Sequence, residues 1–162
     1  MSHPLLLSIR RAGLLASLLL AGLTPGLALA HGDVTPQAVD TKELPALGDA
    51  WRPENPYRQN DKAVKIGSSA YNQNCARCHG LEAISGGIAP DLRKLDNDCA
   101  PMKDAKKKTA CSAEMDDYYM GSVRRGKVRN GAVYMPPFEG ILNQEVMWSI
   151  KAYLENGREK PL

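Results

Sequence analysis

Apolar and small residues recur at helical spacing directly before the first cysteine pair. Counted from Ala63, they fall at positions i, i+3, i+4, i+7 and i+8, which places them on one face of a helix. The residues of this face are Ala63, Ile66, Gly67, Ala70 and Tyr71. Asn60 or Asp61 can cap the helix at its start. The sequence therefore predicts a helix that begins at Asp61 and runs into Cys75.

Two further helices are indicated later in the chain. One is expected to start at Ser112, a plausible cap, and to end at Gly126 after the basic pair Arg124 and Arg125. The other begins near Asn143 and stops by Gly157. Its apolar face consists of Val146, Ile150, Tyr153 and Leu154. A short helix or turn is expected over 91–95, and no strand alternation of useful length appears. The pattern is that of an all-α protein.

The first 30 residues have the three parts of a secretory signal. Arg10 and Arg11 form a basic region, an apolar run covers 12–23, and small residues at 28–30 suit a cleavage site. The apolar run is short for a membrane span, although an uncleaved anchor is the alternative. We expect cleavage before His31, a periplasmic location and no membrane span in the mature chain.

A proline-punctuated extension follows the signal. Residues 31–60 contain Pro36, Pro45, Pro53 and Pro56, which are too closely spaced for a long helix. The apolar side chains in this segment suggest a strap that lies against the domain, and a partner contact is the alternative. They are Leu44, Leu47, Trp51 and Tyr57. Residues 61–162 would form the domain itself.

Composition and charge narrow the functional classes. Removing residues 1–30 from the 162 leaves 132 residues, enough for one domain with an extension. Aromatic residues are sparse, so a bound apolar cofactor would help to complete the core. Without Arg10 and Arg11, 19 basic side chains face 18 acidic ones, a net charge of +1. We therefore do not expect the protein to bind nucleic acid.

The strongest chemical signal is the C-x-x-C-H motif of Cys75, Cys78 and His79. Positions i, i+3 and i+4 share one helical face, so two thiols can hold one haem covalently while the imidazole binds its iron. A redox dithiol and half of a zinc site are the alternatives. No second cluster with zinc spacing is present in the sequence, and we therefore expect one haem c, with His79 as the proximal iron ligand.

The choice of a second iron ligand is limited. After signal cleavage only His31 and His79 remain as histidines, so a second histidine ligand would require the N-terminal residue to fold back. Three methionines, Met115, Met120 and Met147, lie in expected helices and are assigned to packing, and Met102 lies in a lysine-rich loop. Met135 is expected in a loop stiffened by the two prolines that follow it. We predict Met135 as the distal ligand, which favours a high reduction potential.

Three other features surround this predicted site. The carbonyl of Pro90 can accept the ring N–H of His79 and orient the imidazole, although a simple turn proline is an equal alternative. Cys99 and Cys111 favour a disulfide in an oxidising compartment, with free buried thiols as the alternative. The disulfide would close a loop that carries Lys103, Lys106, Lys107 and Lys108.

A basic cluster precedes the Met135 segment. Its members are Arg124, Arg125, Lys127 and Arg129. If the segment covers one side of the haem, this cluster would ring the haem edge and could steer an acidic partner. A solvated helix end is an equally good interpretation.

Together these residues resemble the class I (monohaem) cytochromes c over about 61–157. The shared features are Gly67, Tyr71, Cys75–His79, Ala89-Pro90-Asp91-Leu92, Met135-Pro136, Trp148 and Ala152-Tyr153-Leu154. The resemblance implies helices wrapped around one haem, crossing first and last helices, a Pro90 carbonyl bonded to His79, and Met135 on the iron.

A narrower resemblance is to periplasmic cytochromes c that accompany quinoprotein (PQQ-dependent) alcohol dehydrogenases. It is carried by His31-Gly32-Asp33-Val34, Asn55-Pro56-Tyr57-Arg58, Cys75–Leu81 and Ser85-Gly86-Gly87. It implies that such a dehydrogenase is the electron donor and that a terminal oxidase or a downstream cytochrome is the acceptor.

The expected function is one-electron transfer by a monomer that is not an enzyme. The first alternative is a haem enzyme or a gas or ligand sensor, which needs a labile sixth ligand; no distal histidine is expected within the domain. The second is a fixed haem subunit of a dehydrogenase complex, tethered by 31–60.

Overall fold

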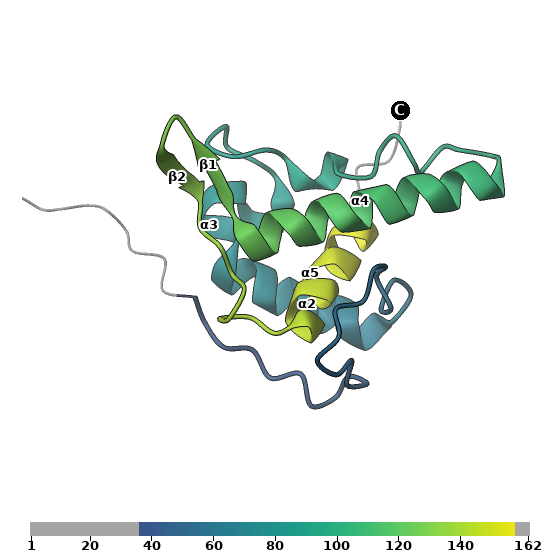
Figure 1. Ribbon diagram of the computed structural model, residues 1–162, viewed down its shortest axis with the longest axis horizontal. Coiled ribbons are helices and arrows are strands. Elements are labelled where there is room, and N and C mark those ends of the chain that lie inside the picture. The colour runs from purple at the N-terminus through teal and green to yellow at the C-terminus, as the bar shows by residue number, and fades with distance from the viewer. Residues whose placement is uncertain (1–35, 158–162) are drawn as a thin grey trace, which may run out of the picture. The chain divides into compact units, whose positions relative to one another are not determined.

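The computed structural model describes residues 36–157, and the predicted signal at 1–30 lies outside them. Figure 1 shows the described part as helices with one small hairpin. In chain order the elements are α2 (Asp61–Asn74), α3 (Ala76–His79), the short 3₁₀ turns η1 (Leu81–Ala83) and η2 (Leu92–Lys94), α4 (Ala105–Arg125), β1 (Lys127–Arg129), β2 (Ala132–Met135) and α5 (Gln144–Asn156). The fold is mostly helical, as the sequence predicts, and the small hairpin is the departure from an all-α pattern.

Helices α2 and α5 form the centre of the fold, and both follow the predicted boundaries. The Asn60 side chain accepts a hydrogen bond from the Ala63 amide at 3.1 Å, and Asn143 caps α5 through Val146 at 2.9 Å. Each helix buries the face that its periodicity predicts, including Gly67 and Tyr71 of α2. Local capping and periodicity therefore suffice to define these two helices.

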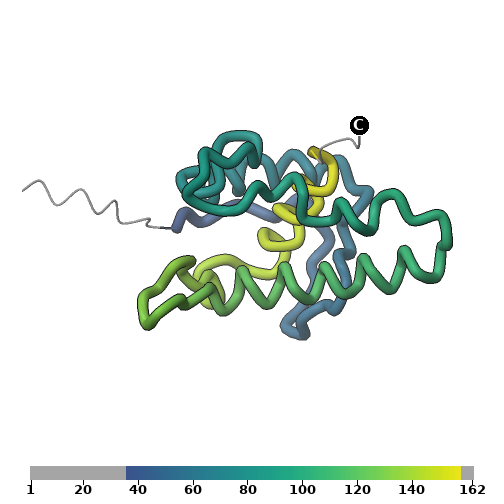
Figure 2. Tube along the Cα trace, turned by 90° about the horizontal axis from the view of Figure 1, so that it is seen from above, coloured from purple at the N-terminus to yellow at the C-terminus, as the bar shows by residue number. Residues whose placement is uncertain are grey.

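The crossing of α2 and α5 depends on a residue without a side chain (Figures 1 and 2). A Cβ atom added to Gly67 would lie 1.9 Å from the carbonyl oxygen of Ser149, far inside van der Waals contact. One turn further along, the rings of Tyr71 and Tyr153 lie 5.4 Å apart and extend the contact. Glycine thus lets the two backbones touch.

Helix α4 is longer than the sequence pattern predicts, because it begins at Ala105 and not at Ser112. The Asp104 side chain is the true cap and accepts a hydrogen bond from the Lys107 amide at 2.9 Å. Lys106, Lys107 and Lys108 therefore occupy the first turns of a helix, which corrects the expected lysine-rich loop. The prediction failed because these exposed turns have no apolar periodicity to mark them.

A two-stranded hairpin follows α4, where only a loop was expected. Asn130 and Gly131 adopt φ values of 51° and 78° and form the turn, a conformation typical of Asn-Gly in hairpins. Strands β1 and β2 pair antiparallel, with Lys127 opposite Met135. Met135 is thus the last residue of a strand. The Asn-Gly pair was the sequence signal for this hairpin.

Residues 36–60 lie against the helices in an irregular path. Leu44, Leu47 and Tyr57 are buried in the common core. The Leu47 amide donates to the Glu145 carboxylate at 2.8 Å, which attaches the segment to the first turn of α5. Near its other end, the Gln37 amide donates to the Asn74 side chain at 2.7 Å. The described part of the proline-rich segment therefore has a structural role as a strap.

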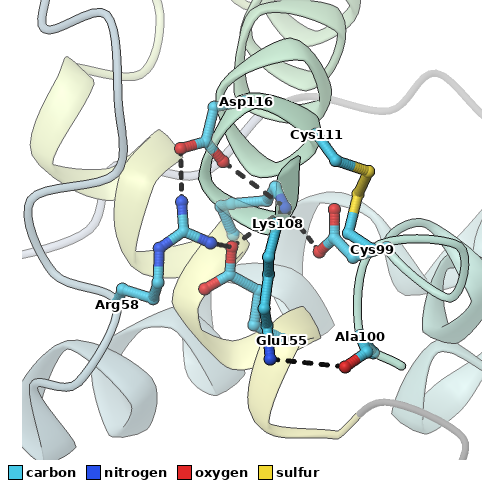
Figure 3. Close-up of a disulfide and its surroundings, with 9 residues drawn as sticks. Arg58, Cys99, Ala100, Lys108, Cys111, Asp116 and Glu155 are labelled. Carbon is cyan, nitrogen blue, oxygen red and sulfur yellow. Dashed lines mark hydrogen bonds and ion pairs between the residues drawn. A yellow bond between two sulfur atoms is a disulfide. The ribbon is translucent and has the colours of Figure 1, made fainter. Parts of the chain in front are cut away.

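A disulfide joins Cys99 to Cys111, the pairing that the sequence favours (Figure 3). Their Cα atoms are 5.6 Å apart, and the bond ties the segment after η2 to the second turn of α4. The Lys108 ammonium donates to the Ala100 carbonyl oxygen at 3.3 Å beside it. The disulfide fixes the N-terminal half of α4 to the rest of the domain.

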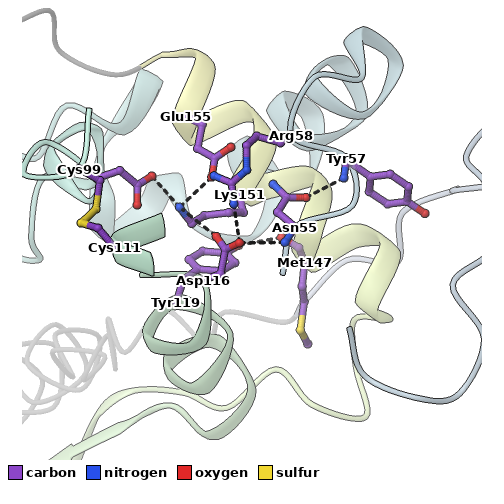
Figure 4. A network of polar contacts seen from close by, with 11 residues as sticks. Asn55, Tyr57, Arg58, Cys99, Cys111, Asp116, Tyr119, Met147, Lys151 and Glu155 are labelled. Atoms are coloured by element: carbon purple, nitrogen blue, oxygen red, sulfur yellow. Dashed lines mark hydrogen bonds and ion pairs between the residues drawn. A yellow bond between two sulfur atoms is a disulfide. The ribbon is translucent and has the colours of Figure 1, made fainter. Parts of the chain in front are cut away.

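Next to the disulfide lies a buried ionic cluster that the sequence did not reveal (Figure 4). Lys151 of α5 is fully buried, and its ammonium lies 2.6 Å from Asp96, 3.0 Å from Glu155 and 3.6 Å from Asp116. Arg58 bonds both Asp116 and Glu155 at 2.5 Å. Burial raises the pKa of Glu155, and the two cations oppose this shift. The cluster links four separate segments of the chain.

Candidate haem site

Cys75, Cys78 and His79 share the single turn of α3 and the cap that precedes it. Cys75 ends α2 and begins α3, and its carbonyl oxygen accepts hydrogen bonds from the amides of Cys78 at 3.1 Å and His79 at 3.0 Å. The turn therefore has the geometry that the motif requires. The Tyr71 hydroxyl donates to the Gly80 carbonyl oxygen at 2.8 Å and holds the end of this turn against α2.

The motif opens into a largely apolar cavity of about 330 Å³. Its walls come from the end of α2, α3, the segment around η2, the C-terminal half of α4, and the hairpin with the residues after it. The predicted residues Cys75, Cys78, His79, Pro90 and Met135 all line it. Apolar and aromatic side chains that the sequence analysis did not assign complete the wall, namely Ile88, Leu92, Leu95, Tyr118, Tyr119, Val123, Tyr134 and Phe138. Only the fold, and no local signal, brings these together.

The His79 ring is oriented by the backbone of Pro90. Its Nδ1 atom lies 2.9 Å from the Pro90 carbonyl oxygen, within hydrogen-bonding distance. A protonated Nδ1 that donates to this carbonyl leaves Nε2 free to bind a metal. Asp91, the next residue, caps η2 through the Arg93 amide and forms an ion pair with the Arg93 guanidinium at 2.6 Å, which fixes this stretch of backbone.

Among the methionines of residues 36–157, only Met135 lines the cavity. Met120 and Met147 are buried in the helical core, as their spacing predicts. Behind Met135 the backbone is closely packed, because a Cβ atom added to Gly126 would lie 2.3 Å from the Met135 carbonyl oxygen. After the two prolines, the Phe138 amide donates to the Val123 carbonyl oxygen at 3.0 Å. The segment is thus attached to the end of α4.

The surroundings of the thiols disfavour the two alternative interpretations of the motif. Burial raises the pKa of the Cys75 thiol to about 12, with a smaller contribution from Cys78. A reactive dithiol requires the opposite shift, toward the thiolate. Within residues 36–157 no group of three or more histidine, cysteine or acidic side chains could hold a zinc ion. An apolar wall that carries two thiols and an imidazole instead fits a haem group.

The predicted basic cluster is divided between two environments. Lys127 lines the cavity, and its ammonium lies 4.7 Å from the centre of the Tyr118 ring. Arg124 is directed elsewhere, because it pairs with Glu139 at 2.7 Å and stacks over Trp51 at 4.0 Å. Arg125 and Arg129 are exposed. Lys127 is therefore the member of the cluster that lies at the cavity.

Comparison with known proteins shows the family to which the chain is similar. A family model described as cytochrome c oxidase, cbb3-type, subunit III matches residues 62–154. The chain is 56% identical to a cytochrome c550 of Pseudomonas aeruginosa over 144 residues, which is 86% of this chain and 90% of the relative. No solved structure matches the chain significantly.

Two larger enzymes contain a similar segment. The chain is 32% identical over 103 residues to the quinohemoprotein alcohol dehydrogenase ADH-IIG of Pseudomonas putida, and 29% identical over 110 residues to ADH IIB of the same species. The matches cover 63% and 68% of this chain but only 12% and 13% of the enzymes. The similarity is therefore confined to a small part of each dehydrogenase.

Proposed function

We propose that this chain is a periplasmic one-electron carrier that accepts electrons from a PQQ-dependent alcohol dehydrogenase. The chain belongs to the cytochrome c family. Its cofactor is a covalently bound haem c, as in its family. The observation that carries the proposal is the cavity itself, since the four residues predicted to contact the cofactor and Pro90, which is predicted to orient His79, all line it. The cofactor supplies an iron that takes up and releases one electron.

In this proposal each of the five residues has one role. Cys75 and Cys78 would bind the haem through thioethers, and His79 and Met135 would bind its iron. The Pro90 carbonyl accepts a hydrogen bond from His79 and holds its ring in place. A nitrogen and a thioether ligand together favour a high potential, which suits an electron acceptor.

Two protein ligands on the iron favour electron transfer over catalysis or gas sensing. A sensor or a peroxidase needs an iron position that a small molecule can reach. The segment that carries Met135 is attached to Gly126 and to Val123, which supports a methionine ligand that the protein keeps in place on the iron. The packing of residues 36–60 against α5 likewise argues against their use as a free tether to a larger complex.

The partner proposal rests on the relatives. Two quinohemoprotein alcohol dehydrogenases contain a segment similar to this chain, so a domain of this kind occurs together with such an enzyme in one polypeptide. We infer that the separate chain receives electrons from a dehydrogenase of that class. The matching family model, named for an oxidase subunit, supports a terminal oxidase or another cytochrome as the acceptor.

Location and domain boundaries complete the proposal. Covalent haem attachment and a disulfide suit an oxidising compartment outside the cytoplasm. We propose that residues 1–30 direct export and are removed, and that 61–162 form the haem domain with 31–60 as an extension. Within residues 36–157, no helix combines the length and the apolar character that a membrane crossing requires.

Spectra of the holoprotein test the ligand assignment. We expect a low-spin spectrum in both redox states and slow binding of carbon monoxide to the ferrous protein at neutral pH. Met135→Ala should raise the carbon monoxide binding rate and lower the potential, whereas Met102→Ala, a methionine outside the cavity, should change neither. An unchanged spectrum and potential in Met135→Ala would exclude Met135 as the ligand.

A separate experiment tests the donor. Purified PQQ alcohol dehydrogenase and its alcohol should reduce the ferric holoprotein, with a rate that depends on the concentration of the holoprotein. Omission of the alcohol is the control. If dehydrogenases of this class fail to reduce the protein while a chemical reductant does, the donor assignment is wrong and the carrier assignment stands.

A further inference from the structure

We propose that Tyr134 is a positioning residue for the distal ligand, and that its hydroxyl fastens the Met135 strand to the loop that orients His79. This inference rests on the proposed ligation of the iron by Met135. The proposal is based on one hydrogen bond, in which the Tyr134 hydroxyl donates to the carbonyl oxygen of Ile88 at 2.8 Å. Tyr134 directly precedes Met135, and Ile88 lies two residues before Pro90. The bond therefore joins the strand that carries the predicted iron ligand Met135 to the loop whose Pro90 carbonyl contacts His79.

An irregularity in the hairpin directs Tyr134 to this bond. Val128 pairs with Val133 and Lys127 pairs with Met135, so Tyr134 has no partner residue in the ladder. An extra residue of this kind is a β-bulge, which changes the direction of a side chain. Tyr134 lines the cavity together with Ile88, and both are exposed, so their bond lies at the mouth of the cavity.

The rest of the hairpin offers little other support. Val128 and Val133 are 68% and 66% exposed, so the paired strands pack against few neighbours. On the side of α4, Gly126 and the residues after the prolines fix the hairpin. On the side of the cavity, the Tyr134 bond ties the strand to the opposite loop. Without it, the strand can move away while its attachment to α4 remains.

The acceptor of this bond is itself held in place. The Ser85 hydroxyl donates to the Ala89 carbonyl oxygen and accepts a hydrogen bond from the Gly87 amide at 3.0 Å. The loop around Ile88 is therefore closed by its own hydrogen bonds. The Tyr134 hydroxyl therefore donates to a carbonyl oxygen in a loop that is held in place, and this bond restricts the movement of the Met135 strand.

Exchange of the distal ligand in the ferric holoprotein tests the proposal. Tyr134→Phe keeps the ring and removes only the donor. We expect the band that marks a methionine ligand to persist at neutral pH, and the rate at which added imidazole displaces the methionine to rise about fivefold, the effect of losing one hydrogen bond. The matched control is Tyr57→Phe, which removes a hydroxyl bonded to the Pro45 carbonyl oxygen outside the cavity. Its exchange rate should equal that of the wild type.

The outcomes separate this inference from the proposed function. A rise in Tyr134→Phe with no change in Tyr57→Phe supports the inference. Equal exchange rates in the wild type, Tyr134→Phe and Tyr57→Phe overturn the inference. If Met135→Ala abolishes the methionine band in that case, the proposed ligation by Met135 still stands, without a role for Tyr134. Should Met135→Ala leave that band unchanged, both the ligation and the role of Tyr134 are wrong. A rise that both tyrosine variants share follows from lost stability alone and also overturns the inference.

Discussion

The ring Nδ1 of His79 lies 2.9 Å from the carbonyl oxygen of Pro90, and the two residues belong to segments joined by a loop of ten residues. A carbonyl that accepts the ring proton makes the other nitrogen a stronger donor to a metal. The position of that carbonyl depends on what fixes the backbone after Pro90. Asp91 does so, since it caps η2 and pairs with Arg93.

Asp91→Ala should therefore alter the haem site as well as stability. Loss of the cap should cost about 1 kcal/mol of unfolding free energy. A displaced Pro90 carbonyl weakens the donor strength of His79, so the reduction potential should rise. Asp104→Ala removes the cap of α4 at a distance from the cavity and should give a similar loss with an unchanged potential. Redox titration and denaturant unfolding of the holoproteins measure both quantities, and equal potentials in both variants would refute this role.

Gly67→Ala should disrupt the crossing of α2 and α5. The added methyl group would meet the backbone of Ser149, which cannot rotate away as a side chain can. We expect a loss of about 3 kcal/mol, despite the better helix propensity of alanine. Gly86→Ala is the control, because a Cβ atom there meets nothing within 4 Å. Denaturant unfolding of the two holoproteins should separate them clearly, and similar stabilities would show that the helices can shift apart without cost.

Lys151→Met should be among the most destabilising single changes in α5. It leaves the carboxylates of Asp96, Asp116 and Glu155 with Arg58 as the remaining cation of the cluster. Removing one partner of a buried ion pair costs about 3–5 kcal/mol of unfolding free energy. Lys62→Met, at an exposed pair with Glu43, should cost less than about 1 kcal/mol. A small loss in Lys151→Met, measured by denaturant unfolding at neutral pH, would mean that the acids take up protons readily.

Tyr57 should make the protein less stable in alkaline solution. Burial raises the pKa of Tyr57 to about 12 in the folded protein from an ordinary value of 10.0. The unfolded chain then releases this proton first, so the stabilisation is complete below pH 10 and is lost as the pH rises toward 12. A difference of this size corresponds to about 3 kcal/mol. Tyr57→Phe should thus show a smaller fall in unfolding free energy between pH 9 and about pH 12; parallel curves would contradict the prediction.

The residues predicted most accurately from the sequence are those whose signals are local. The boundaries of α2 and α5 follow from Asn60, Asn143 and Gly157, which act within one turn of their own position. The cysteines and histidine of the motif are likewise close in sequence. The start of α4 was missed because Asp104 caps a turn of lysines without an apolar face, and the hairpin was missed although Asn130 and Gly131 marked its turn.

Residues that depend on distant partners could not be assigned in this way. Lys151 has the sequence context of an exposed lysine, and it is buried because acids from three segments surround it. Tyr119 reaches the cavity wall through the direction of α4, which its own neighbours do not determine. Tyr134 acquires its bond to Ile88 from a bulge in the strand pairing. Such roles emerge only when the tertiary structure is known.

The contact between Gly67 and Ser149 also makes closure of the fold depend on two helices that lie far apart in the chain. Between α2 and α5 come α3, α4 and the hairpin, so most of the domain separates the two helices. Until α5 docks, the face of α2 that includes Ala63 and Ala70 lacks its packing partner, and the central crossing cannot form. The turn of Cys75, Cys78 and His79, in contrast, is held by hydrogen bonds within five residues. The thiols can therefore be presented by local structure before the two distant helices close the fold around them.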